Sequence, residues 1–200
     1  MRSGLGRGHS VVNRKVSSSQ EILKVALQLV QEEGIQAVNM RRLAKRCQIS
    51  LGVLYNYFED KNDLLLQTVA AVWRDILIPD QAGHLNRSSQ PLSQAFMTLY
   101  QLLAEGAKKY PHFFSQHTLV FSQSQKSQAN EQMDRYINHL KGYLLQCLED
   151  DPDIRNQAFE KHSADQVVDF LFAIFINQVM QGKLDIGLFI DFIDRYLYDH

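Results

Sequence analysis

The chain contains little proline, little cysteine and no long apolar run. Its 200 residues include 4 prolines and 2 cysteines. Strand-like alternation of apolar and polar residues is absent, as are the residue pairs that form tight hairpin turns. The longest apolar run, residues 170–176, is far too short to span a bilayer. The N-terminus has no apolar segment of the kind found in signal peptides. These absences predict an all-α, cytoplasmic protein.

Motifs for catalysis and for metal binding are also absent. The sequence has no glycine-rich phosphate loop and no Gly-x-Ser-x-Gly nucleophile motif. His112 and His117 have no acidic or thiol partner at ligand spacing. Asp150, Asp151 and Asp153 lack the later ligands and the glycine of a calcium loop. We therefore predict no enzymatic activity, no catalytic residue, no cofactor and no metal site.

The two cysteines, Cys47 and Cys147, each lie on an apolar helical stripe. We interpret both as buried small hydrophobic side chains in a reducing compartment. A redox switch is the alternative, but two cysteines in different segments give it little support.

The net charge of −1 hides an uneven distribution. Residues 1–61 carry ten lysines and arginines against five acidic residues, so the rest of the chain is acidic. A basic front indicates that only the N-terminal part meets a polyanion. Residues 1–16 are predicted to be a disordered basic arm, or a remnant that is not native to the protein.

Capping residues predict where the helices begin. Capping boxes open helices at Ser18 and Ser163, and Asp60 caps a helix that runs to about Leu77. Pro111 is predicted to open another helix at its first position. Residues 122–130 are predicted to be a loop or a frayed helix end before a helix over about 131–148. Residues 154–161 are predicted to form a short helical turn.

Two short helical patterns joined by a tight turn occupy residues 39–58. The first has apolar residues at the spacing of one helix face, and these are Met40, Leu43, Ala44 and Cys47. The second keeps Leu54 and Phe58 inward, four apart. This leaves a small, apolar and aromatic face outward: Leu51, Gly52, Val53, Tyr55 and Asn56. Such a face makes sense on a soluble protein if it enters a DNA groove.

A longer set of residues keeps its order and spacing without a gap from Gly34 to Leu65. It includes Arg41, Leu43-Ala44, Ile49-Ser50, Gly52, Leu54-Tyr55, Tyr57-Phe58, Lys61 and Asp63-Leu64. This stretch closely resembles the helix-turn-helix of TetR-family transcriptional regulators. Gln48 departs from the family pattern, because the turn position is usually a glycine, which accepts a positive φ. Leu51 stands where a polar or basic residue is common.

The resemblance implies a fold and a set of DNA-binding residues. The fold is a helix-turn-helix domain over residues 17–64, followed by a larger helical domain for effector binding and dimerisation over residues 65–200. Leu51 and Val53 suit thymine methyl groups, and Asn56 suits an adenine edge. The full predicted set, which includes groups suited to phosphate oxygens, is Arg41, Ser50, Leu51, Gly52, Val53, Tyr55, Asn56, Tyr57 and Lys61.

Each of these residues also has a structural interpretation. Tyr57 is equally suited to the core between helices, and Gly52 to a helix start. Lys45 and Arg46 are interpreted as solvated residues that do not bind DNA. The DNA-binding hypothesis therefore depends on the whole set.

Two C-terminal helices, predicted over about 163–181 and 186–198, are too apolar to be buried on one side only. One interpretation is a central core helix and its neighbour. The resemblance implies the other, a homodimer interface to which each subunit contributes two helices. The predicted interface residues are Phe172, Phe175, Val179, Phe189, Ile193 and Leu197.

The resemblance also implies a small effector, bound in the C-terminal domain, that releases the protein from DNA. Aromatic residues supply the predicted pocket: Phe96, Tyr100, Phe113, Phe114, Phe121, Tyr136, Tyr143 and Phe170. His112, His117 and His139 are candidates for polar contacts. The alternative is that these aromatic residues form the core.

The predicted function is a homodimeric repressor that binds a palindrome-like operator in double-stranded DNA and is released by a hydrophobic or aromatic effector. Two alternatives remain open at this point. One is a DNA-bound adaptor whose C-terminal domain recruits a protein partner without an effector. The other is activation in place of repression.

Overall fold

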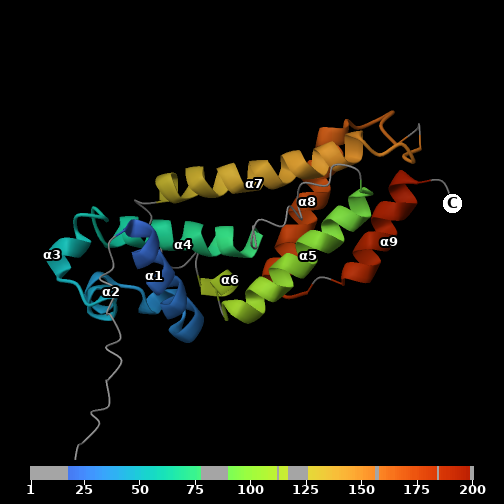
Figure 1. The fold of residues 1–200 in the computed structure, drawn as a ribbon. Coiled ribbons are helices and arrows are strands. Elements are labelled where there is room, and N and C mark those ends of the chain that lie inside the picture. The colour runs from blue at the N-terminus through green and yellow to red at the C-terminus, as the bar shows by residue number, and fades with distance from the viewer. Residues whose placement is uncertain are drawn as a thin grey trace, which may run out of the picture.

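The computed structural model describes residues 18–77, 90–111, 113–116, 126–155, 158–183 and 185–198. Over these residues the chain is all helical and contains no strand, so the predicted fold class is confirmed (Figure 1). The predicted basic arm at residues 1–16 lies outside the described residues. The elements are α1 (Ser19–Glu33), the 3₁₀ turn η1 (Ile35–Ala37), α2 (Met40–Cys47), α3 (Leu51–Leu54), α4 (Lys61–Leu77), α5 (Leu92–Lys109), α6 (Phe113–Gln116), α7 (Lys126–Glu149), α8 (Ala164–Met180) and α9 (Ile186–Leu197).

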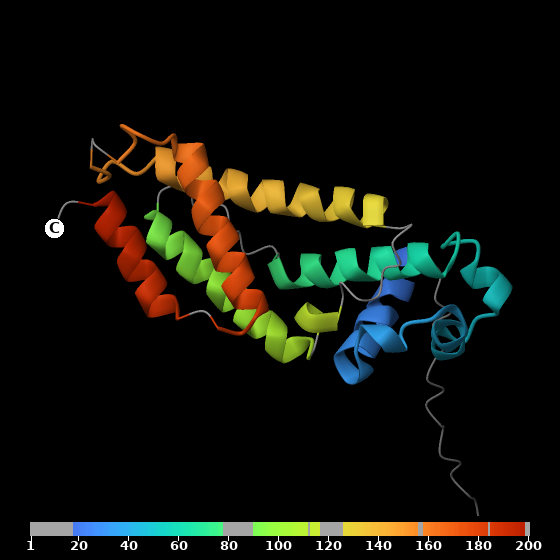
Figure 2. The same ribbon diagram turned by 180° about the vertical axis from the view of Figure 1, so that it is seen from behind.

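The helices are arranged along one long axis. Helices α1, α2 and α3 gather at one end of the molecule, and α9 lies at the other (Figures 1 and 2). Between them, α4 packs on α1 and on α5, α7 packs on α5 and α8, and α5 packs on α9. The N-terminal end is therefore joined to the rest of the molecule mainly through α4, and α6 also packs on η1.

The predicted caps are present at three helix starts. The Ser18 hydroxyl accepts a hydrogen bond from the Glu21 amide at 3.2 Å, and both halves of the capping box are formed between Ser163 and Gln166. Asp60 accepts from the backbone amides of Asn62 and Asp63 at 2.7 and 2.9 Å. These hydrogen bonds lower the pKa of the Asp60 carboxyl, because they stabilise its charged form.

Three predicted boundaries are wrong. Helix α7 begins at Lys126 and not near residue 131, so residues 126–130 are the start of that helix, the second of the two alternatives for this segment, and are not a loop. Their polar composition suggested a loop, but lysine, glutamine and alanine are good helix formers. Helix α6 begins at Phe113, and Pro111 lies in the turn before it. The described residues of 154–161 form turns and no helix.

Helix α4 is apolar on almost every side because both halves of the molecule pack on it. Leu65, Val69, Val72 and Ile76, which the pattern predicts to face inward, are all buried. Trp73 and Thr68 are buried as well, and the Thr68 hydroxyl donates to the Leu64 carbonyl at 2.7 Å. Within the described residues, no helix has the length and hydropathy of a membrane span.

Candidate nucleic-acid interface

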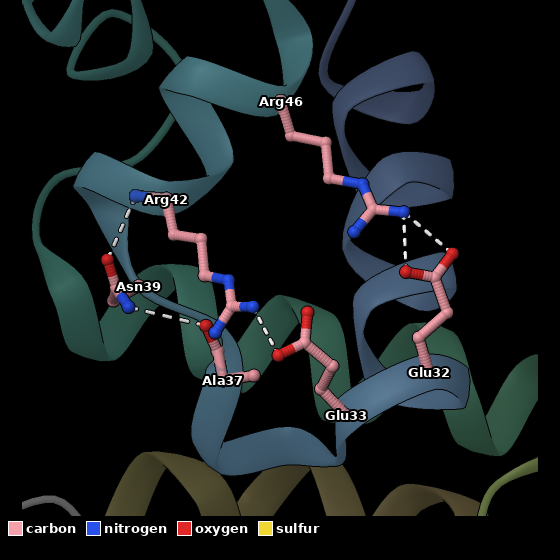
Figure 3. A network of polar contacts seen from close by, with 6 residues as sticks. All are labelled: Glu32, Glu33, Ala37, Asn39, Arg42 and Arg46. Atoms are coloured by element: carbon pink, nitrogen blue, oxygen red, sulfur yellow. Dashed lines mark hydrogen bonds and ion pairs between the residues drawn. The ribbon is translucent and has the colours of Figure 1, made fainter.

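Asn39 fixes the start of α2. Its side-chain oxygen accepts a hydrogen bond from the Arg42 amide at 2.9 Å, and its side-chain nitrogen donates to the Ala37 carbonyl at 3.3 Å (Figure 3). The cap thus ties α2 to the preceding 3₁₀ turn. The inward face of α2 is confirmed, since all four of its predicted residues are buried. One of them is Cys47, and burial raises the pKa of its thiol, which therefore stays protonated at neutral pH.

The turn between α2 and α3 has a left-handed residue at Gln48. Its φ is 56° and its ψ is 36°, and among the described residues it is the only one other than glycine with a positive φ. The next amide, that of Ile49, donates to the Ala44 carbonyl at 3.0 Å and closes the end of α2. The turn therefore adopts a conformation that favours glycine even though a glutamine occupies it.

We expect replacement of Gln48 by glycine to raise the free energy of unfolding by about 0.5–1 kcal/mol. Relief of the left-handed conformation outweighs the extra entropy that glycine gives the unfolded chain. Urea denaturation followed by circular dichroism measures the change. The control is Gln48→Ala, which retains the strain and should give no gain. A loss of stability in the glycine variant would show that the contacts of the glutamine side chain outweigh the strain.

Helix α3 presents an apolar outer face. Its N-cap, Ser50, accepts a hydrogen bond from the Val53 amide at 3.2 Å, while Leu54 is fully buried and holds the helix to the core. Three large side chains point outward: Leu51 is 36% exposed, Val53 37% and Tyr55 51%. Gly52 and Asn56 are exposed as well. The predicted inward and outward faces are therefore confirmed, whereas their contacts with DNA stay a prediction.

Gly52 lies in open surroundings within the chain. A Cβ atom built at this position would meet no described atom closer than the Ser50 hydroxyl oxygen, at 3.9 Å. Packing inside the protein thus does not require a glycine here. An absent side chain on an exposed helix matters most when another molecule approaches the backbone closely.

The basic residues of α2 divide into two sets. Arg42 is ion-paired with Glu33, and Arg46 is ion-paired with both carboxylate oxygens of Glu32 at 2.6 Å (Figure 3). Both acids lie at the C-terminal end of α1. Arg46 is exposed, as its interpretation as a solvated residue predicts, but the fold also brings an acid of α1 against it, a contact between residues far apart in the sequence.

Three other cations near α3 are exposed and lack such partners. They are Arg41 and Lys45 on the outer side of α2 and Lys61 at the first position of α4. Over the described ranges no ion pair includes any of the three. Tyr57 is partly buried and packs against the core, as its structural interpretation predicts. The exposed surface around α3 thus combines an apolar centre with free positive charge.

The six predicted dimer-interface residues lie mostly inside the chain's own core. Side chains of five are buried, and Val179 is partly buried. The buried five are Phe172, Phe175, Phe189, Ile193 and Leu197. The exposed apolar residues of α8 and α9 are a different set, and they line one groove of about 470 Å³: Phe170, Ile174, Leu188 and Phe192. The sequence pattern of α8 and α9 could not show which face is buried and which is exposed, because both helices have apolar residues on all sides.

The predicted aromatic pocket is divided into separate clusters. The Phe96 ring packs against Phe175 and Phe189 with centroids 5.2 and 5.1 Å apart. In the second cluster, Trp73 of α4 packs against Phe113 and Phe114 of α6, at 5.8 and 5.5 Å.

The other predicted pocket residues are scattered. Tyr143 is buried beside Gln90, which donates to its hydroxyl. Tyr100 is partly buried, whereas Phe170 is exposed in the groove of α8 and α9. Phe121, the Tyr136 side chain, His112 and His117 lie outside the described residues, and His139 is exposed.

A polar junction between α4 and α5 escaped the sequence analysis. The buried Tyr110 hydroxyl donates to Asp75 at 2.7 Å, and the Lys109 ammonium pairs with the same carboxylate at 2.6 Å. Burial, and then the neighbouring carboxylate, raise the pKa of Tyr110. No periodic signal links Asp75 to Tyr110, 35 positions away. Among the described side chains, no group of three potential ligands could hold a metal ion.

Comparison with known proteins identifies the N-terminal region. Residues 22–68, which extend from α1 into α4, match the family model of bacterial regulatory proteins of the TetR family. These residues are thus similar to the N-terminal domain of the TetR family. The region is therefore the helix-turn-helix, DNA-binding domain of a transcriptional regulator.

The curated relatives are similar to this chain over a short stretch. An HTH-type transcriptional regulator of Staphylococcus aureus (strain bovine RF122 / ET3-1) is 37% identical over 54 residues, which are 27% of this chain and 29% of the relative. A second, from strain USA300, is 44% identical over 45 residues, or 22% of this chain and 24% of the relative. The matched part is thus less than a third of either relative's length.

Several solved structures share the fold over most of the chain. The chain matches RolR without ligand at a TM-score of 0.59 and 20% identity, covering 90% of both chains. BioQ in complex with its double-stranded DNA operator gives 0.56 at 13% identity, over 92% of this chain and 100% of that one. The fatty acid degradation regulator FadR of Bacillus halodurans gives 0.55 at 17%, over 90% and 95%. At these identities the likeness concerns the fold alone.

Neutralising the acids that hold Arg42 and Arg46 should strengthen non-specific DNA binding and make it more sensitive to salt. In Glu32→Gln with Glu33→Gln, both arginines are released, and each one that reaches a phosphate steepens the slope of log affinity against log salt by about 0.9. Titration of random duplex DNA at several salt concentrations measures the slope. The control is Glu105→Gln, which breaks a surface ion pair with Lys108 on α5. An unchanged slope in the double variant would show that the arginines cannot reach DNA.

Proposed function

We propose that the protein is a homodimeric repressor that binds a palindrome-like operator in double-stranded DNA. The observation that carries the proposal is the exposed apolar face of α3 beside Arg41, Lys45 and Lys61. Apolar side chains suit base edges in the major groove, and free cations suit the phosphates on either side of it.

The groove of α8 and α9 supports the homodimer. Phe170, Leu188 and Phe192 are each more than half exposed in the single chain, and the groove they line is mostly apolar, with Gln178, Lys183 and Asp185 also bordering it. Such a surface on adjacent helices is the kind that a second copy buries in a four-helix arrangement. A twofold axis there would present two α3 helices to successive major grooves, about 34–36 Å apart.

An apolar effector is the proposed release signal. The side chains available to receive it are the rings of Trp73, Phe113 and Phe114, which connect α4 to α6. A ligand that separates these rings prefers a different placement of α4, and α4 carries the helix-turn-helix. The proposal therefore predicts that effector binding and operator binding oppose each other through this helix.

A DNA-bound adaptor without an effector is the second candidate. It is favoured by the close packing of the aromatic clusters and by a groove of about 390 Å³ lined by Phe170, Phe192 and Tyr196, which a protein partner could fill. A screen of apolar and aromatic compounds against the protein–operator complex separates the candidates. Release of DNA by any such compound supports the repressor, whereas binding that withstands the whole screen favours the adaptor.

Selection of random duplex DNA by the purified protein, at two salt concentrations, tests operator binding itself. We expect a palindromic motif whose affinity falls steeply as salt rises. Absence of any enriched motif, with only weak salt-sensitive binding, would overturn the proposal.

A further inference from the structure

The outer face of α3 contains no cation. Its exposed side chains are those of Leu51, Val53, Tyr55 and Asn56, with Gly52 between them. A guanine edge is most often read by arginine or lysine, which donate two hydrogen bonds to its O6 and N7 atoms. The part of the interface that enters the groove therefore lacks the group that recognises guanine best.

The two arginines of α2 that could come near α3 are instead ion-paired with α1. Arg42 and Arg46 point from α2 toward the C-terminal end of α1, where Glu33 and Glu32 neutralise them (Figure 3). The cations that stay unpaired, Arg41, Lys45 and Lys61, belong to α2 and α4. Positions beside the reading helix suit the sugar–phosphate backbone, which carries no sequence information.

What α3 offers to a base edge is branched apolar surface. Leu51 and Val53 are about one third exposed. A contact that removes their apolar surface from water is favourable, so a complex with any partner that covers these side chains is stabilised. In the major groove, the one apolar group on a base edge of unmodified DNA is the 5-methyl group of thymine. Gly52 between them allows the backbone to come close to the bases, since nothing inside the protein requires a glycine there.

We propose that this face reads its operator half-site through thymine 5-methyl groups contacted by Leu51 and Val53, without a guanine-reading cation. The inference rests on the proposed operator binding and specifies its chemistry. It predicts half-sites whose central positions are A·T pairs with thymines at fixed places, and it assigns Leu51 and Val53 as specificity-determining residues.

Replacement of thymine by deoxyuracil in the selected operator tests the proposal, because it removes only the methyl group and keeps every hydrogen-bonding atom. Each contacted methyl should contribute about fourfold in affinity. The wild-type protein should therefore lose about fourfold on each of the key substitutions. Leu51→Ala and Val53→Ala should each bind the thymine operator more weakly, and each should lose discrimination at the thymine that its own side chain contacts. Arg41→Ala should weaken binding to both duplexes equally, since a phosphate contact does not sense the base.

Each outcome has a separate meaning. Equal wild-type affinity for the thymine and deoxyuracil operators, or selection of half-sites centred on conserved guanines, overturns the inference and leaves operator binding intact. Discrimination that stays unchanged at every thymine in both alanine variants also overturns the assignment of these residues. If the selection enriches no motif, the proposed function fails and the inference fails with it.

Discussion

A protein with aspartate in place of both Leu188 and Phe192 is expected to be a folded monomer with greatly weakened operator binding. These side chains are 71% and 55% exposed in the single chain, so the substitutions should leave the fold of the protomer intact. A dimer interface would enclose the new carboxylates in apolar surroundings, where unpaired charge costs several kcal/mol. A monomer has only one helix-turn-helix domain, so its operator affinity should fall by about 100-fold or more, as expected when two linked binding sites become independent.

Size-exclusion chromatography with light scattering gives the mass, and titration of the operator gives the affinity. The matched control is Gln146→Asp, which places one new carboxylate on an exposed position of α7 outside the groove. It should stay dimeric and keep its affinity. A double variant that remains dimeric would place the interface on another surface, and a wild-type protein that is monomeric would remove the homodimer from the proposal.

Replacement of Phe96 by alanine is expected to be the most destabilising single change considered for this chain. The ring is fully buried at the contact of α5 with α8 and α9, against Phe175 and Phe189. Removal of a buried phenylalanine costs about 3–5 kcal/mol through lost burial and the cavity left behind. The result distinguishes a core residue from the pocket residue that the sequence predicts, since a residue lining an open pocket has less packing to lose.

Urea denaturation of the full chain measures the loss in unfolding free energy. Tyr100→Ala is the control on the same helix, and because Tyr100 is only partly buried it should cost less. The opposite result would be a Phe96→Ala variant that loses less than about 1.5 kcal/mol of unfolding free energy and responds differently to an effector that releases DNA. It would show that Phe96 lines the effector pocket.

The parts of this protein that could be predicted from sequence depend on short-range signals. The inward faces of α2 and α3 follow from helical spacing, and the starts at Ser18, Asp60 and Ser163 follow from side chains that bond amides within three residues. Such contacts form whenever the local helix forms, whatever surrounds it. The exposed, apolar face of α3 was predictable for the same reason.

The parts that could not be predicted depend on where distant segments meet. Helix α8 is apolar on every side, so spacing cannot decide that Phe172 and Phe175 enter the core while Phe170 and Ile174 stay outside. That choice is made by α5, α7 and α9 packing around it. The pairing of Arg46 with Glu32 has the same origin, because 14 residues separate them and only the crossing of α1 and α2 brings them together.

The burial of α4 on nearly all sides also bears on how the protein unfolds. One set of its side chains completes the core beneath the helix-turn-helix, and another completes the core of the C-terminal part, so neither half retains a closed core without it. Heat or denaturant should therefore melt both halves in one cooperative transition. A molecule bound at either end then protects the other end from unfolding, and this mutual protection requires no change of shape.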